Sequence, residues 1–278
     1  MRGAWGRLGA GALVALALVF VLGPLVWVLD LALRDGAQLG SAIDPTRWGW
    51  QTFEALFARR DASGWPLFVR QLCNSLLVAG CTAVVATSVS ATAAYALSRF
   101  RFVGRDRGLR LLLAVQMFPG VVALVPIYLI LDGLGLIDRL AGLVLVYAST
   151  AIPFSVWMLK GFYDQVPVEI EEAARLDGAN RWQVFRHVVL PLVRPGLAVT
   201  ALYAFLGGWN EFILAATLLD DEARYTVPVA LQQWIGAYGA RWDLFAAGAV
   251  IVSLPVIALF YVLQRHLTAG LTAGAVKG

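Results

Sequence analysis

Six long, uncharged and mostly apolar runs constrain the fold of this chain more than any other feature. An α-helix needs about 20 residues to cross the ~30 Å hydrocarbon core of a bilayer. Runs of about that length recur over the whole chain, at Leu8–Leu29, Gln71–Ser98, Leu111–Leu131, Leu140–Leu159, Pro195–Leu219 and Leu244–Gln264. Glu211 is the only charged residue in these six runs. The pattern predicts an all-α integral membrane protein with six transmembrane helices.

The composition agrees with a membrane protein. Of the 278 residues, 60% are hydrophobic and 14% are charged, whereas soluble domains carry about 25% charged residues. The net charge of +4 would also suit nucleic-acid binding. However, the arginines gather between the apolar runs and not along one basic face, so we interpret them as topology signals.

Basic residues in the short connections predict the orientation, because Lys and Arg are enriched on the cytoplasmic side. The connections 99–110 and 160–194 are rich in them, whereas 132–139 and 220–243 are poor and hold acids as well. The first run is longer than the apolar segment of a signal peptide, so we expect it to be retained. The chain is therefore predicted to be a multi-pass protein of the cell (inner, cytoplasmic) membrane with both termini in the cytoplasm.

Residues for catalysis or metal binding do not cluster in the sequence. Cys73 and Cys81 share one run, about 12 Å apart on a helix, which is too far for a disulfide. His187 and His266 are isolated. The sequence predicts no metal site and no catalytic residues.

The connection 164–195 carries the most information about function. Pro167 and the acids that follow it suit the start of a short helix. Gly178 provides a stop, and Asn180 can cap a second helix that Pro191 is expected to end. The first helix has a compact, alanine-lined surface. Docking of another protein and a helix lying on the membrane both fit this pattern.

One motif in this connection resembles a known family. Glu172-Ala173-Ala174, then Gly178 after three residues, then Val188-x-Leu190-Pro191 after nine more, is similar to the EAA loop of binding-protein-dependent ABC importer permeases. Val188 stands where that family usually has Ile, a conservative difference. The resemblance implies a type I permease fold whose cytoplasmic coupling helix sits in a groove of an ATP-binding subunit. The implied coupling residues are Glu171, Glu172, Ala173, Ala174, Leu176, Asp177 and Gly178.

Other segments resemble the carbohydrate branch, in particular the smaller permease subunit of maltose/maltodextrin-type importers. They are Gln116–Pro119, Trp209–Phe212, Gln232–Gln233, Asp243–Gly248 and Gly270–Gly278. This resemblance implies a permease subunit that moves a maltose- or maltodextrin-like oligosaccharide, or a related glycoside, into the cytoplasm. The arrangement of the apolar runs divides the chain into three expected regions: a first helix with its extracytoplasmic loop (1–70), a five-helix body that the resemblance identifies as a type-1 permease domain (71–266), and a cytoplasmic tail (267–278).

The sequence lacks the Gly-x-x-x-x-Gly-Lys-Ser/Thr loop that cradles ATP phosphates. We therefore expect a non-catalytic subunit that binds no cofactor itself, with ATP and Mg on partner subunits. The resemblance implies a second permease subunit in a heterodimer, two ATP-binding subunits and an extracytoplasmic sugar-binding protein. Membrane lipid surrounds such a chain, and nucleic acid is not an expected partner.

Polar side chains inside the runs are candidates for a translocation pathway, since such groups are costly in a membrane. Glu211, beside Asn210, either faces the pathway or lies near the outer interface against a neighbouring subunit. Gln116 lies near two prolines that predict a kinked third helix beside a hydrated path. Asn74 is a further candidate.

Two alternatives to a sugar importer remain at this stage. One is the permease of an ABC importer for a different substrate. The other is a secondary transporter, which would need more ionisable residues in its spans than Glu211 alone.

Overall fold

The computed structural model describes residues 2–236 and 239–275, with side chains placed over 11–236 and 239–264. Within this part of the chain, helices dominate, and the only β-pairing is an isolated bridge between Arg60 and Pro66. The chain divides into two compact units, residues 1–70 with 229–255 and residues 71–228 with 256–278. The three regions predicted from the sequence stay a prediction, and the side chains of the tail 267–278 lie outside the described residues.

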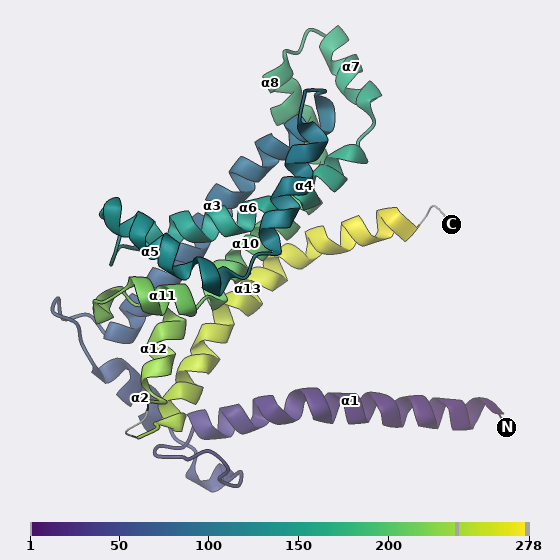
Figure 1. Cartoon of the computed structure of the whole chain (residues 1–278). Coiled ribbons are helices and arrows are strands. Elements are labelled where there is room, and N and C mark those ends of the chain that lie inside the picture. Colours follow the sequence, from purple (N-terminus) through teal and green to yellow (C-terminus); the bar gives the residue numbers. More distant parts are fainter. Residues whose placement is uncertain (1, 237–238, 276–278) are drawn as a thin grey trace. The chain divides into compact units, whose positions relative to one another are not determined.

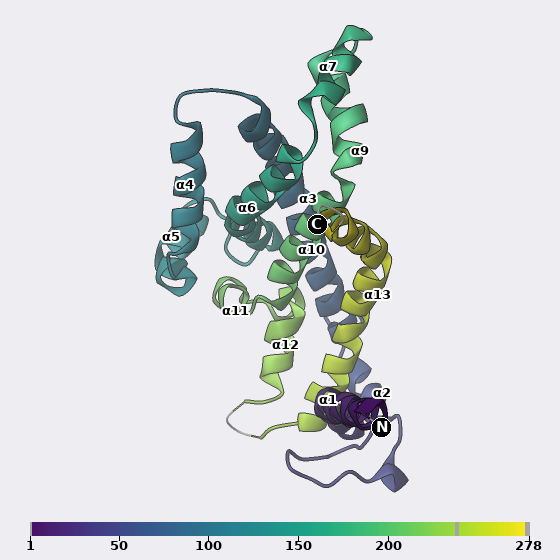
Figure 2. The ribbon, with the colours of Figure 1, turned by 90° about the vertical axis from the view of Figure 1, so that its right-hand side faces the viewer.

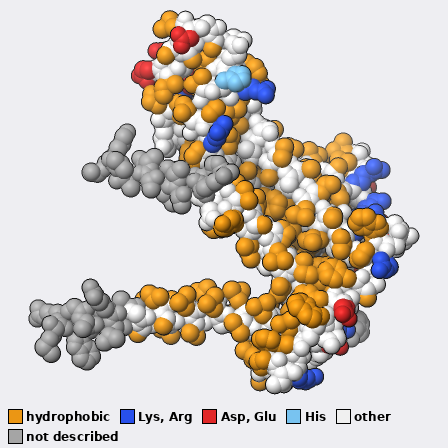
Figure 3. All heavy atoms as spheres, turned by 180° about the vertical axis from the view of Figure 1, so that it is seen from behind, with side chains coloured by type: hydrophobic (Ala, Val, Ile, Leu, Met, Phe, Trp, Pro, Cys, Tyr) orange, Lys and Arg blue, Asp and Glu red, His pale blue; other side chains and the backbone are white. Residues whose placement is uncertain are grey.

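Among the described residues, four helices are long and apolar enough to cross a membrane. They are α1 (Arg2–Ala32), α3 (Leu67–Arg99), α6 (Leu140–Asp164) and α13 (Trp242–Ala275), and they contain the first, second, fourth and sixth predicted runs (Figure 1). On the face shown in Figure 3, hydrophobic side chains cover the helices and charged side chains lie mainly toward their ends. Two bent helix pairs also pass the test of length and hydropathy. One is Arg105–Gln116 with Gly120–Gly133, which contains most of the third run, and the other is Arg181–Leu192 with Arg194–Asn210, which contains the first part of the fifth run. They bring the number of candidate spans among the described residues to as many as six.

The third run is not one continuous helix, which corrects the sequence-based prediction. Helix α4 (Arg105–Gln116) is followed by the 3-10 turn η2 (Gly120–Ala123) and α5 (Leu124–Gly133), with a bend of 92° between the two parts. Pro119 adopts an extended ψ of 118° and has no N–H to donate. The predicted kink is therefore a complete break of the helix.

The fifth run, Pro195–Leu219, is also interrupted, which again corrects the prediction. Helix α10 (Arg194–Asn210) ends before Glu211, and the short helix α11 (Ile213–Leu218) follows. Glu211 has an extended ψ of 128°, and its carboxylate accepts the backbone N–H groups of Leu214 at 2.9 Å and Ala215 at 3.1 Å. The side chain thus satisfies donors at the start of α11 that an unbroken helix would have bonded internally.

In the first unit, two buried aspartates hold the loop after α1. Asp30 accepts hydrogen bonds from Trp48 Nε1 at 2.9 Å and from the Asp44 backbone at 3.0 Å, and it also pairs with Arg34. Asp243 accepts from the Gly36 backbone at 2.9 Å. This loop contains η1 (Pro45–Arg47) and α2 (Gln51–Ala58).

The body of the second unit is built by α3, α6 and α10. Helix α6 packs against α10, α4 and α11. A Cβ at Gly208 of α10 would lie 3.4 Å from the Ala79 Cα of α3 and 3.3 Å from the Tyr147 ring of α6. Small residues of this kind let membrane helices approach closely. The loop after α11 contains η4 (Glu222–Arg224) and leads into α12 (Val227–Gln233).

The connection 164–195 forms a helical projection at one end of the second unit (Figures 1 and 2). It consists of α7 (Val168–Leu176), α8 (Arg181–Gln183), the π-helix η3 (Val184–Val189) and α9 (Leu190–Leu192). The prediction that Pro191 ends the second helix is wrong, because the helical segment continues to Leu192. The wider π turn, in which Leu190 N–H bonds to Phe185 O, comes directly before Pro191 and accommodates a residue that cannot donate.

Candidate functional site

Helix α7 exposes most of the residues that the sequence predicts to couple this chain to an ATPase. Glu172, Ala173, Asp177 and Gly178 are exposed, whereas Ala174 is half-buried against the hydrophobic cluster beneath the helix. Leu176 is 89% exposed, although it is a large aliphatic residue at the end of the helix. The outer face of α7 therefore presents alanine, leucine and acidic groups side by side.

Glu171 points the other way, into the protein. Its side chain is fully buried and accepts a hydrogen bond from Tyr95 Oη at 2.7 Å and from Arg99 Nε at 2.5 Å, both on α3. Arg175 Nη2 lies 3.7 Å from the second carboxylate oxygen. Arg99 also donates to the Val166 carbonyl at 2.7 Å. A buried charge needs such partners, so Glu171 joins α7 to the end of a long apolar helix.

The turn after α7 has the geometry predicted from the sequence. Gly178 adopts a φ of +93°, its N–H bonds to Arg175 O at 3.0 Å, and the Ala179 N–H bonds to Ala174 O at 3.0 Å. This pair of bonds is a Schellman motif with glycine at its left-handed position. Asn180 then forms a capping box with Gln183 at the start of α8, so the predicted stop and cap are both confirmed.

An aromatic cluster fixes this segment to the long helices. Phe185 of η3 lies with its ring centroid 4.8 Å from that of Tyr95, and Tyr163 of α6 lies 5.7 Å from Tyr95. Val184 and Val189 are fully buried in the same cluster. Trp182, by contrast, is 59% exposed. The projecting segment is thus packed onto both α3 and α6.

A cavity of about 410 Å³ lies within the second unit. Side chains from α4, α6, α10 and the start of α11 line it, including Gln116 and Glu211, two of the four residues predicted for the pathway. The break after α10 places Glu211 there, where Tyr147 Oη donates to its carboxylate at 2.6 Å. Gln116 donates to the Thr150 carbonyl at 2.7 Å, which joins the end of α4 to α6.

The other two predicted pathway residues lie elsewhere. Asn210 is exposed and donates to Leu206 O at 3.0 Å within its own helix. Asn74 donates to the carbonyls of Ala223 and Tyr225, at 2.9 and 3.1 Å, and so holds the loop after α11 against the start of α3. Neither residue lines the cavity, and their part in a pathway stays a prediction.

The sequence reasoning missed Tyr147, Thr150 and Tyr203, which also line the cavity. Tyr147 and Thr150 are three residues apart on α6 and therefore share a helix face. Tyr203 packs against Phe154, with ring centroids 4.6 Å apart and the ring planes tilted by 47°. Polar side chains at helical spacing inside an apolar run were the signal that could have identified them. Among the described residues, no group of three His, Cys, Asp or Glu could hold a metal ion.

Long apolar helices, two bent helix pairs and a cavity between helices into which a few polar side chains project define this chain as a polytopic membrane protein of the permease class. Residues 83–272 match the model of the family described as "Binding-protein-dependent transport system inner membrane component", and the chain belongs to this family. It is thus a permease subunit of an ABC importer.

Sequence relatives extend over nearly the whole chain. The maltodextrin transport system permease protein MdxG of Bacillus subtilis is 36% identical, over 94% of this chain and 92% of the relative. The maltose/maltodextrin permease protein MalG of Salmonella typhimurium is 36% identical, over 96% and 94%. The trehalose permease protein SugB of Mycobacterium tuberculosis is 34% identical, over 93% of both.

A solved structure confirms the fold. A chain in the crystal structure of a bacterial ABC transporter involved in the import of the acidic polysaccharide alginate matches with a TM-score of 0.79 and 23% identity. The match covers 94% of this chain and 96% of that chain. The architecture is the type I ABC importer permease fold expected from the EAA-like loop.

Proposed function

We propose that this chain moves a maltodextrin-like oligosaccharide or a related glycoside across the cell membrane into the cytoplasm. Relatives at 34–36% identity are named for maltodextrin, galactooligosaccharides and trehalose. The sugars in these names belong to one chemical class but are different compounds. The names therefore support a class of substrate and not one particular sugar. The alternative is an ABC importer permease for a substrate that is not a sugar.

The cavity suits a sugar in transit. Glu211, Gln116 and Thr150 offer polar groups, and Tyr147 and Tyr203 add aromatic rings on which a sugar can pack. We assign the pathway to this cavity, with Glu211 and Gln116 as its polar contacts. Uptake kinetics of Glu211→Gln and Gln116→Ala test this assignment. Unchanged KM and maximal rate in both variants would rule it out.

The exposed face of α7 is the observation that carries the coupling role. An 89% exposed Leu176 beside Ala173 is a surface that another protein can cover, and the buried Glu171 pair gives that helix a rigid base. In this proposal α7 docks on a separate ATP-binding subunit. That subunit, and not this chain, holds ATP and Mg, so the chain is a non-catalytic component that binds no cofactor.

The remaining partners follow from the same proposal. A second permease chain would complete the pathway, two ATP-binding subunits would provide hydrolysis, and an extracytoplasmic binding protein would deliver the sugar. The arginine-rich connections 99–110 and 160–194 favour the cytoplasmic side for α7 and for both termini.

Reconstitution tests the proposal directly. The chain would be co-expressed with a candidate second permease and ATP-binding subunit, purified, and placed in liposomes with the binding protein. We expect ATP hydrolysis that rises when a maltodextrin-loaded binding protein is present, together with sugar uptake. Uptake by this chain without any ATPase would contradict the proposal. Stimulation by a substrate of another class, with none by sugars, would favour the alternative.

A further inference from the structure

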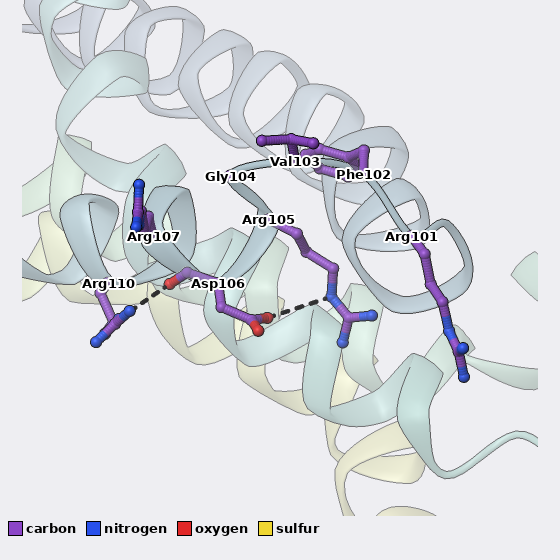
Figure 4. A pocket seen from close by; sticks show the side chains of 8 residues that line it. All are labelled: Arg101, Phe102, Val103, Gly104, Arg105, Asp106, Arg107 and Arg110. Carbon is purple, nitrogen blue, oxygen red and sulfur yellow. Dashed lines mark hydrogen bonds and ion pairs between the residues drawn. The ribbon is translucent and has the colours of Figure 1, made fainter.

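The turn between α3 and α4 forms an arginine-rich hollow that has no part in the proposed transport function. This open depression has a volume of about 560 Å³ and is lined by Arg101, Phe102, Val103, Gly104, Arg105, Asp106, Arg107 and Arg110 (Figure 4). Four arginines and one aspartate give this lining a net charge of +3. An excess of positive charge of this size in one short turn favours the approach of a negatively charged group.

The single acid in the hollow, Asp106, forms an ion pair with only one of the four arginines. Arg105 Nε lies 3.5 Å from Asp106 Oδ1, and Arg110 Nε donates to the Asp106 backbone carbonyl at 3.3 Å. Arg101 and Arg107 are exposed and form no ion pair with a carboxylate of the described residues. Each of these two guanidinium groups can therefore bind an anionic group of a ligand.

The surroundings of the hollow are apolar. Phe102 is 51% exposed and Val103 is fully exposed between the arginines. Along α4, one turn and two turns further, Leu111 is 66% exposed and Val115 is 57% exposed. The hollow joins the end of the apolar helix α3 to the first half of a bent candidate span. Charge beside exposed hydrocarbon fits an amphiphile better than a soluble ion.

The hollow also lies near the coupling segment within the second unit. Arg99, two residues before the first lining residue Arg101, pairs with Glu171 of α7, and the Arg181 guanidinium lies 5.6 Å from the Phe100 ring centroid. A ligand bound there would therefore sit beside the base of α7.

We propose that this arginine hollow binds the phosphate of an anionic phospholipid, with the acyl chains lying along the exposed side of α4. Basic clusters at the end of a membrane span attract anionic headgroups, and each Arg near the surface contributes about a fivefold gain in affinity. Phosphatidylglycerol provides the required phosphate and hydrocarbon together. The inference does not depend on the sugar or on the ATPase.

Native mass spectrometry of the purified full chain in detergent tests this inference. Phosphatidylglycerol should bind more tightly than phosphatidylcholine, and Arg101→Gln with Arg107→Gln should weaken its binding by about 30-fold. Arg101→Lys with Arg107→Lys should retain most of the binding, which separates lost charge from lost folding. Arg47→Gln with Arg139→Gln removes the same charge from two other exposed positions and should leave the affinity unchanged.

Three results would overturn the proposal. Equal affinity of the wild type and the glutamine variant for phosphatidylglycerol would show that the lipid does not bind in this hollow. Displacement of the lipid by low-millimolar inorganic phosphate would make it a site for a free anion. Unchanged lipid binding, combined with loss of co-purification with the ATP-binding subunit, would assign the hollow to an acidic protein surface.

Discussion

At the scale of single residues, Glu171 and Glu172 are neighbours with opposite environments. Glu171 is buried against Tyr95 and Arg99, whereas Glu172 is exposed. Removing one partner of a buried pair leaves an uncompensated charge and typically costs about 3–5 kcal/mol. Glu171→Ala should therefore lower the melting temperature of the purified chain strongly, and Glu172→Ala should not.

A second measurement separates the ion pair from packing. Because Arg99 is the charge left behind, the double variant Glu171→Ala with Arg99→Ala should be more stable than the sum of the two single changes predicts. Strict additivity, or equal melting temperatures for the Glu171 and Glu172 variants, would show that the pair does not hold α7.

Gly178 matters through its backbone and not through its surroundings. Its φ is +93°, and a Cβ built there would meet nothing within 4 Å. A valine at this position would cost about 1–2 kcal/mol of backbone strain, whereas asparagine adopts the left-handed region more readily. Gly178→Val should therefore disturb the end of α7 and uncouple sugar uptake from ATP hydrolysis in the reconstituted complex, while Gly178→Asn should transport close to normally. Transport by the valine variant at the wild-type rate would contradict the coupling role.

At the scale of elements, adjacent glycines of α10 provide a matched pair. A Cβ at Gly208 would lie 3.3–3.5 Å from atoms of Tyr147, Ala79 and Thr82, whereas one at Gly207 would meet nothing within 4 Å. Overpacking of this kind costs about 1–3 kcal/mol. Gly208→Val should thus lower the melting temperature by several degrees, and Gly207→Val should change it little. Equal melting temperatures of the two variants would show that α10 does not pack closely on α3.

The sequence predicted the helices well and their interruptions poorly. A run of about 20 uncharged, apolar residues can be recognised in the sequence alone. Helices α1, α3, α6 and α13 therefore lie where the hydropathy predicts them. Interruptions depend on where backbone donors find partners. Glu211 breaks the fifth run because its carboxylate accepts two N–H groups of α11, and Pro191 fails to end a helix because a π turn precedes it.

The candidate site, too, could be predicted from the sequence only where local chemistry determines it. Gly178 and Asn180 could be predicted because caps are local chemistry. The burial of Glu171 could not, because its partners Tyr95 and Arg99 are 76 and 72 residues away in the sequence. The cavity likewise brings together side chains from α4, α6 and α10, and no local pattern relates them.

At the scale of the second unit, α7 is tied to α3 by a buried ion pair and to α3 and α6 by aromatic packing. Helix α6 in turn provides Tyr147 and Thr150 to the cavity. A displacement of α7 would therefore act on helices that line the proposed pathway. Rigid-body movement of packed helices is an established way to convert such a displacement into altered access.

The orientation of the whole molecule in the membrane is the prediction on which this coupling depends. An ATPase in the cytoplasm can reach α7 only if the connection 160–194 lies on that side, as its five basic residues indicate. The loop after α1 should then lie outside.

Cysteine labelling tests this orientation. In a background with Cys73→Ser and Cys81→Ser, a single cysteine introduced by Ser63→Cys should react with a membrane-impermeant maleimide in intact cells. A cysteine introduced by Asp177→Cys should react only after the membrane is opened. Both positions are exposed in the chain, so failure to react reports the side of the membrane once labelling in opened cells has shown that each thiol is accessible. Labelling of the Asp177→Cys variant in intact cells would place α7 beyond the reach of a cytoplasmic ATPase, and the coupling role would then have to be abandoned.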